Sequence, residues 1–485
     1  MMIAMNADKN GLDEGTRKLL YAWLSFAVAS LMFAGIFAFM IVAARTPFVH
    51  SLFPRPDYIR VALVGHVTLS FSIWFLAFGG LLWTWTSTRL LNTAPFNKMF
   101  AWGGLLLSVA GALLVIIAAA SGTGDPQFIN YVPVLTHPLF YTGLLLLASG
   151  IILTLINTFL TIGRAWQEKS YEGRLPVLTF GMAISGTAAL NAAACFALSY
   201  YFQVVAPSEK TPVNLEMLFW GGGHVLQFTH TITMVTVWLF LTSLVFNKFP
   251  LKESYSKGLY LLYLIFILPA PFSYLFLDAS SAQYIRFFTG LMEYGLGPST
   301  AIFSIAILAL IASKRFKELP WNRPEFASLV ISMILFGLGG LISFKIYGYN
   351  TKVPSHYHGA IGGITLAFMG LTNHLLSRLE RETYSRRLAA IQPYIYGTGQ
   401  ALFVFGLYWA GAHGVARKTF GAEQHLDNAA KMAGMVITGI GGGIAILGGI
   451  LFIVNSLASL LRNSSRRLKP AATHLKSHQD TSGGE

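Results

Sequence analysis

Long apolar runs dominate this sequence and constrain its fold more than any other feature. A helix that crosses the hydrocarbon core of a bilayer needs about 20 mainly apolar residues. The chain of 485 residues contains twelve such runs, which are rich in the small residues that let helices pack closely in lipid. The predicted spans are 19–44, 61–85, 99–120, 138–162, 177–200, 218–246, 259–277, 288–312, 326–344, 359–376, 394–413 and 432–461. The sequence therefore predicts an all-α integral membrane protein with twelve transmembrane helices.

The charged residues support this class and orient the chain. Only 11% of the residues are charged, against about 25% in soluble proteins, which is too few to cover a soluble globule. The net charge of +14 could indicate nucleic-acid binding, but in a membrane protein it usually reflects basic loops on the cytoplasmic side. With the N-terminus inside, 24 of the 34 lysines and arginines lie in cytoplasmic segments. We therefore expect both termini in the cytoplasm and no nucleic-acid partner.

The same runs divide the chain into three parts. We expect a cytoplasmic N-terminal segment at 1–18, a membrane domain at 19–461 and a polar cytoplasmic tail at 462–485. The first apolar run is long enough to span, so no cleavable signal peptide is expected. The single cysteine, Cys195, excludes disulfide frameworks, iron–sulfur ligation and thiolate zinc sites. The expected location is the inner, cytoplasmic membrane, where the protein is surrounded by lipid.

Four histidines begin even-numbered spans and are thereby placed at one depth, near the outer side of the membrane. His66 begins the second span, His224 the sixth, and His356 and His358 the tenth. Polar side chains inside spans are costly and usually functional. Residues two apart on a helix point about 200° apart, so His356 and His358 cannot chelate one metal ion together. They can each ligate a different haem iron, which accepts axial imidazole.

This arrangement of histidines resembles the catalytic subunit, subunit I, of the haem-copper oxidase superfamily. That group includes cytochrome oxidases and nitric oxide reductases, and the resemblance covers 19–461. It implies two haems, which we expect to be b-type. His66 and His358 would ligate the low-spin, electron-transfer haem, and His356 would be the proximal ligand of the high-spin haem. His224 would be a ligand of a non-haem metal on the other face of that haem.

A second match lies between the last two spans. The segment from Gly411 to Lys418 is similar to the one in which oxidases place two arginines against haem propionates. Arg417 and Lys418 lie on the outer side in the predicted topology, and cations facing carboxylates are chemically apt. The alternative for this pair is a solvated loop.

The sequence departs from the oxidase pattern at the non-haem metal. Phe228 stands where oxidases carry a tyrosine cross-linked to the histidine of the sixth span, and 276–287 has no histidine where the family supplies two. A copper site with three imidazoles cannot be built in the usual way, so iron is favoured over copper.

The polar residues near this place are Asp278, Glu293 and Gln227. Carboxylate with imidazole suits non-haem iron. We expect Glu293 to be a metal ligand or proton carrier and Asp278 to be a further ligand. Gln227, about one helical turn from His224, is expected to be an active-site group. The alternative for each is a hydrogen-bonded helix cap or a core amide.

The resulting hypothesis is a divergent, nitric oxide reductase-like respiratory terminal reductase. The missing tyrosine and histidine pair favour reduction of nitric oxide to nitrous oxide, which needs only two electrons. The alternatives are an oxygen-reducing cytochrome c oxidase with an altered metal site, a non-enzymatic membrane haem protein, and a transporter whose histidines are coincidental. The chain has no soluble cytochrome domain and no cysteine pair. An outer-side electron-donating subunit or cytochrome c is therefore expected as a partner.

Overall fold

The computed structural model describes residues 13–49, 51, 56–171, 173–207, 213–279 and 281–462. Nearly all of this part is helical, as predicted. Eleven of its helical segments are long and apolar enough to cross a membrane. The predicted tail beyond residue 462 and the first twelve residues lie outside the described part.

The spans are built from α-helices, three of which continue into short segments of other helical type. The second span contains a π-helical segment, η3, the fifth ends in a π-helical segment, η4, and the seventh ends in a 3₁₀ segment, η5. The elements of the spans are α2 (Glu14–Arg45), α3 (Pro56–Val67), η3 (Thr68–Ile73), α4 (Trp74–Thr88), α5 (Lys98–Ser121), α6 (Pro138–Gln167), α7 (Val177–Tyr200), η4 (Tyr201–Val205), α8 (Leu215–Phe246), α9 (Glu253–Ile267), η5 (Pro271–Leu275), α10 (Ala282–Gly295), α11 (Gly297–Ala312), α12 (Pro324–Ser343), α13 (Lys352–Arg378), α14 (Arg386–Ala412) and α15 (Ala429–Leu461). Two short 3₁₀ turns, η6 (Phe316–Glu318) and η7 (Gly421–Gln424), lie in the connections.

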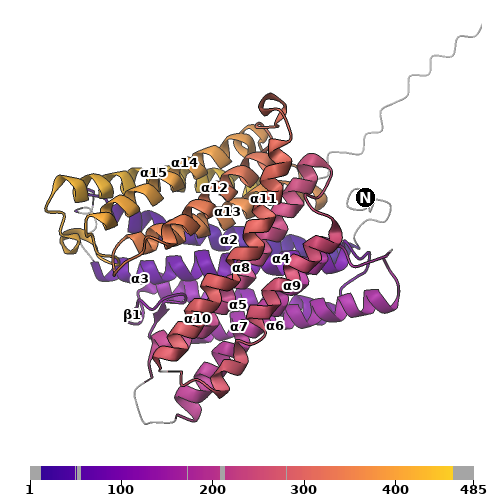
Figure 1. Cartoon of the computed structure of the whole chain (residues 1–485), viewed down its shortest axis with the longest axis horizontal. Helices are drawn as coiled ribbons and strands as arrows, with labels where there is room; N and C mark the ends of the chain where they lie inside the picture. The colour runs from indigo at the N-terminus through magenta and orange to yellow at the C-terminus, as the bar shows by residue number, and fades with distance from the viewer. Residues whose placement is uncertain are drawn as a thin grey trace, which may run out of the picture.

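Of the twelve predicted spans, the eleventh is the one that the hydropathy of the helices does not support. The run predicted at 394–413 corresponds to α14, which is not among the eleven apolar segments. α14 nevertheless lies along α15 and also contacts α12 and α13 (Figure 1). The described part of the structure therefore contains eleven apolar helical segments and, in addition, the long helix α14.

The site is positioned by the most buried helices. Of the 18-residue apolar stretch of α8, 83% is buried inside the protein. The corresponding share is 78% for α13 and 72% for the segment formed by α3, η3 and α4. α8 lies near the centre of the bundle, where it contacts α7, α10, α12 and α13 (Figure 1). The histidines predicted to be functional are all on these three segments. They therefore belong to the interior rather than to the lipid-facing helices.

Local sequence signals explain where several of these helices begin. Asn97, Asn214 and Asn428 are the N-caps of α5, α8 and α15, and each side chain accepts a hydrogen bond from the backbone of the first turn. Such caps satisfy N–H groups that have no partner within the helix.

A small β-hairpin stands out in this helical protein. Strands β1 (Pro126–Gln127) and β2 (Val134–Leu135) pair antiparallel between α5 and α6. The hairpin packs against α3, the helix that carries His66. Its tip contains Tyr131, whose φ of 69° is in the left-handed region. A non-glycine residue there is uncommon and marks a conformation fixed by its surroundings.

Candidate functional site

His66 is held by the first span. Its Nδ1 lies 3.0 Å from the backbone carbonyl oxygen of Ala34 in α2. A carbonyl can only accept, so Nδ1 carries the hydrogen and Nε2 carries a lone pair. The π-helical segment η3 starts two residues later, at Thr68. Such π segments inside α-helices often occur at functional sites.

His356 and His358 are fixed in the same way but toward different partners. Nδ1 of His356 lies 2.8 Å from the carbonyl oxygen of Gly339 in α12. Nδ1 of His358 lies 2.8 Å from the carbonyl oxygen of Pro354, one turn earlier in α13. The contact of His356 with Gly339 requires that α12 and α13 pack closely. A Cβ on Gly359 would lie only 2.7 Å from the Gly339 Cα.

Three imidazoles therefore present a free Nε2 inside the bundle. Within the described residues, no hydrogen bond reaches Nε2 of His66, His356 or His358. All three rings are only partly buried, whereas His224 and His230 are 1% and 2% exposed. His66 and His358 also lie close enough for their charges to influence each other.

This donor set fits haem iron. Imidazoles that ligate a metal usually donate their other ring N–H to a carbonyl or carboxylate, which fixes the tautomer and orientation. His66 and His358 fit two axial ligands of one haem, and His356 fits an axial ligand of another.

The end of this region that the sequence predicts to lie on the outer side is cationic. Arg417 donates a hydrogen bond to the Asn130 side-chain oxygen at 3.3 Å, and its guanidinium lies over the Tyr349 ring at 5.2 Å. Lys418 donates a hydrogen bond to the carbonyl of Phe128. Burial and the neighbouring Arg417 lower the pKa of Lys418 from 10.5 to about 8. A buried ammonium of this kind would be stabilised by an added carboxylate.

Arg45 is a cation that the sequence interpretation did not select. It ends α2, and its Nε and Nη2 are buried without a hydrogen-bond partner among the described residues. Its charge interacts with Tyr357 and His358. Unpaired buried guanidinium nitrogens are costly, and a haem propionate would satisfy them. In the sequence its only signal is its position directly after the first predicted span, at the end that the predicted topology places outside.

His224 has a different environment from the other three. Its Nδ1 lies 2.7 Å from the carbonyl oxygen of Trp220, so this nitrogen carries the hydrogen. Its Nε2 lies 2.8 Å from the hydroxyl of Tyr131, which therefore donates to it. The Gln227 side chain lies near this hydroxyl. Burial raises the pKa of Tyr131 above its usual range, which keeps the phenol protonated.

The three glycines before His224 make room for aromatic rings. A Cβ on Gly223 would lie 2.5 Å from Tyr131 Cβ, and one on Gly222 would lie 2.4 Å from the Phe196 ring. A Cβ on Gly221 would lie 2.4 Å from the Tyr274 hydroxyl. The glycines thus allow the close approach of these side chains to α8.

The predicted non-haem metal ligands are not brought together. Asp278 is exposed in the turn after η5, and Glu293 is exposed on α10. No group of three or more His, Cys, Asp or Glu residues that could hold a metal occurs in the part of the chain that the structure describes. Of the predicted set, only Gln227 lies with His224. The residues present do not fit the non-haem metal that the sequence led us to expect.

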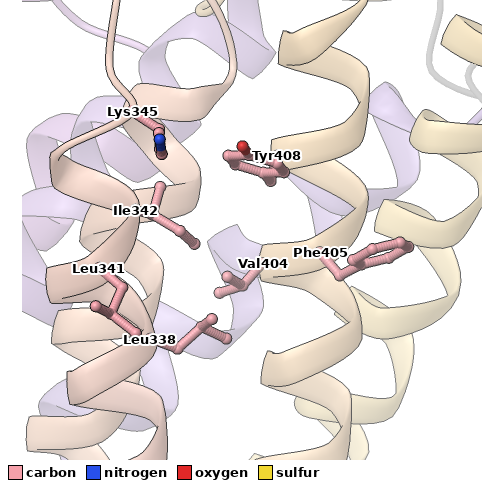
Figure 2. Close-up of a pocket in the computed structure, with 7 residues that line it drawn as sticks. All are labelled: Leu338, Leu341, Ile342, Lys345, Val404, Phe405 and Tyr408. Carbon is pink, nitrogen blue, oxygen red and sulfur yellow. The ribbon is translucent and has the colours of Figure 1, made fainter.

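A groove of about 320 Å³ lies between α12 and α14 (Figure 2). Its wall is mostly aliphatic, with Lys345 and Tyr408 at one end. It adjoins the shell of His356, because Leu338 precedes Gly339 and the Val404 carbonyl accepts a hydrogen bond from Ser355 at 2.7 Å. No histidine lines it, so the groove is not itself a haem-ligating site.

Comparisons with known proteins agree with this arrangement. The family model for cytochrome c and quinol oxidase polypeptide I matches residues 18–445. An uncharacterized protein of Rickettsia prowazekii is 28% identical over 494 residues, which covers 90% of this chain and 94% of that protein. Cytochrome c oxidase subunit 1 of Thermus thermophilus is 23% identical over 508 residues, which covers 96% of this chain and 88% of that protein. The solved structure of a haem-copper terminal oxidase dimer has a TM-score of 0.75 at 18% identity, over 93% of this chain and 85% of that one.

Proposed function

Because the chain belongs to the family of cytochrome c and quinol oxidase polypeptide I, we propose that it is the haem-bearing catalytic subunit of a respiratory terminal reductase. The family implies an oxidoreductase with haems and a multi-pass membrane location. The observation that carries the proposal is the set of three imidazoles, His66, His356 and His358, each with Nδ1 held by a backbone carbonyl and Nε2 free.

The proposed roles follow from this geometry. His66 and His358 would hold the low-spin haem, and His356 would hold the high-spin haem. When bound, the haems would supply one-electron transfer and a binding position for a gas. Arg45, Arg417 and Lys418 would orient the haems by pairing with their propionates, since all three are cations on the predicted outer side. Two guanidinium nitrogens of Arg45 have no hydrogen-bond partner among the described residues. Arg417 bonds to a neutral amide oxygen, and the pKa of Lys418 is lowered. Electrons would enter from an outer-side subunit or cytochrome c, in the cytoplasmic membrane.

Nitric oxide is the substrate we propose first. The segment 276–287 lacks the histidine pair that a copper site of this family needs. Joining two nitric oxide molecules to nitrous oxide requires two electrons and two protons. Two haems can supply these electrons without a further redox centre.

Oxygen is the second candidate, and a specific observation favours it. Phe228 removes the usual tyrosine, but Tyr131 brings a phenol within 2.8 Å of His224 from another part of the chain. A phenol beside the gas-binding position is a source of the additional proton that oxygen reduction needs.

Parallel consumption assays test the proposal. The complex would be purified with its partner subunits, and nitric oxide and oxygen consumption would be measured with the same electron donor. We expect reduced b-type haem bands and faster turnover of nitric oxide, both impaired in His356→Ala. Faster oxygen turnover would select the second candidate. Haem without turnover of either gas would indicate a non-enzymatic haem protein, and absence of haem would refute the proposal.

A further inference from the structure

The lone pair that a metal would need on His224 is already used. Trp220 accepts the Nδ1 hydrogen of this ring at 2.7 Å, so Nε2 is the only ring nitrogen with a lone pair. The Tyr131 hydroxyl donates to it at 2.8 Å. A metal ion at Nε2 would have to displace this hydroxyl.

We propose that no transition metal binds at His224. We propose further that Tyr131, His224 and Gln227, together named the His224 pocket, form a hydrogen-bonding site for a small diatomic ligand. This inference rests on the proposed function, in which a gas binds to the haem held by His356. The ligand class is a diatomic that gains partial negative charge when bound to reduced iron. Gln227 would donate to it from its side-chain amide, and the Tyr131 hydroxyl would turn its single hydrogen from His224 Nε2 to the ligand.

The surroundings of His224 offer aromatic rings rather than metal ligands. The ring centroids of Tyr131, Trp220 and Phe288 lie 4.4, 4.7 and 6.4 Å from that of His224. The carboxylates that could have completed a metal site, Asp278 and Glu293, are exposed. Within the described residues no second imidazole, thiolate or carboxylate joins His224 in a metal-binding group, and one imidazole beside neutral oxygen atoms is a poor site for iron or copper.

Tyr131 is held in this position by several independent contacts. The missing side chain of Gly223 gives it space, and its backbone has a positive φ of 69°. The preceding residue, Asn130, donates its backbone N–H to the Glu216 carboxylate at 3.0 Å. Lys418 binds the carbonyl of Phe128. Such fixation is what a hydrogen-bonding site requires, because donors act best when they are already oriented.

Metal analysis of the purified holoprotein tests the first half of the proposal. Iron, copper, zinc and manganese would be measured per chain, together with the haem content. We expect iron equal to haem and no further metal, in both the natural protein and His224→Ala. One equivalent of non-haem metal that disappears in His224→Ala would overturn the proposal.

Vibrational spectra of the carbon monoxide complex test the second half. A donor near bound carbon monoxide lowers its C–O stretching frequency, so Tyr131→Phe should raise it while the ring still fills the space beside Gly223. Gln227→Met should act in the same direction. Tyr347→Phe, an exposed tyrosine that is 74% accessible, should leave the frequency unchanged. Unchanged spectra in both pocket variants, with haem content retained, would contradict the hydrogen-bonding site.

The proposed function and the absence of a metal at His224 can be refuted separately. A preparation without haem would refute the proposed function. The metal content is measured on the same preparation and decides independently whether His224 binds metal.

Discussion

Arg417 donates a hydrogen bond to the side chain of Asn130 at 3.3 Å and thereby joins the loop before α15 to the β-hairpin tip. The next residue after Asn130 is Tyr131, which contacts His224. The cations Arg417 and Lys418 and the partly buried Tyr131 are therefore parts of one structural unit. Substitution of Arg417 or Lys418 should therefore alter the position of Tyr131 beside His224.

Lys418 should give the stability of the protein a specific pH dependence. Its pKa is lowered to about 8 from 10.5, so between these values the folded protein has lost a proton that the unfolded chain still holds. The free energy of unfolding should therefore rise with pH in this window through the contribution of Lys418, and below pH 8 the cost of its buried charge should be fully present. Thermal unfolding in detergent, measured for the natural protein and Lys418→Met, checks this.

Lys418→Met should lack this rise, whereas Lys345→Met, at an exposed lysine, should keep it. A haem propionate beside Lys418 would stabilise its charged form and raise its pKa in the folded protein. The rise in the free energy of unfolding would then begin at a higher pH. Identical profiles for the natural protein and Lys418→Met from pH 7 to pH 11 would contradict the burial of this charge.

Removal of the predicted axial ligands should change haem content selectively. His66→Ala and His358→Ala should each lose the low-spin haem, because a six-coordinate haem needs both imidazoles. His356→Ala should lose or alter the high-spin haem instead. Haem content per chain and the reduced spectrum measure this. His413→Ala removes an exposed imidazole and should retain both haems. Equal haem loss in all four variants would indicate misfolding rather than ligand removal.

Arg45 should raise the reduction potential of the haem held by His66 and His358. A nearby cation stabilises the reduced form, which carries one positive charge fewer. Arg45→Met should therefore shift the midpoint potential to lower values in a spectroelectrochemical titration. Arg17→Met, at the other end of α2 and paired with Glu380 on the surface, is the matched control. An unchanged potential in Arg45→Met would place the guanidinium away from the haem.

The sequence predicted the helical class and the spans closely because apolar length is a local property. It placed His66, His356 and His358 at one depth from the order of the spans, and all three lie on the most buried segments of the structure. Their roles as haem ligands stay a prediction. The partner of His224 could not be found in this way. Tyr131 is 93 positions away in a hairpin tip, and no periodicity links a loop residue to a helix face. The carboxylates Asp278 and Glu293 were selected by depth alone, and depth does not determine which side of a helix faces inward.

The topology prediction can be tested directly around α14. If α14 spans the membrane, the connections on its two sides lie in different compartments. Reporter fusions at residue 383 and at residue 414 should then give opposite signals, with a cytoplasmic reporter active at the first and a periplasmic reporter active at the second. The positive-inside distribution predicts this order. Equal signals from both positions would show that α14 does not cross.

Gly223→Ala should test the packing on which the His224 pocket depends. The added Cβ would lie 2.5 Å from Tyr131 Cβ, a distance at which one of the two must move. Overpacking of this kind costs about 1–3 kcal/mol, and the Tyr131 hydroxyl should leave His224. We expect a lower thermal midpoint and the same carbon monoxide spectrum as Tyr131→Phe. Gly443→Ala also adds a methyl group to a helix but has nothing within 4 Å, so it should be neutral or stabilising by up to about 1 kcal/mol. If Gly223→Ala behaved like Gly443→Ala, Tyr131 would not be fixed against α8, and the hydrogen bond to His224 would have no structural support.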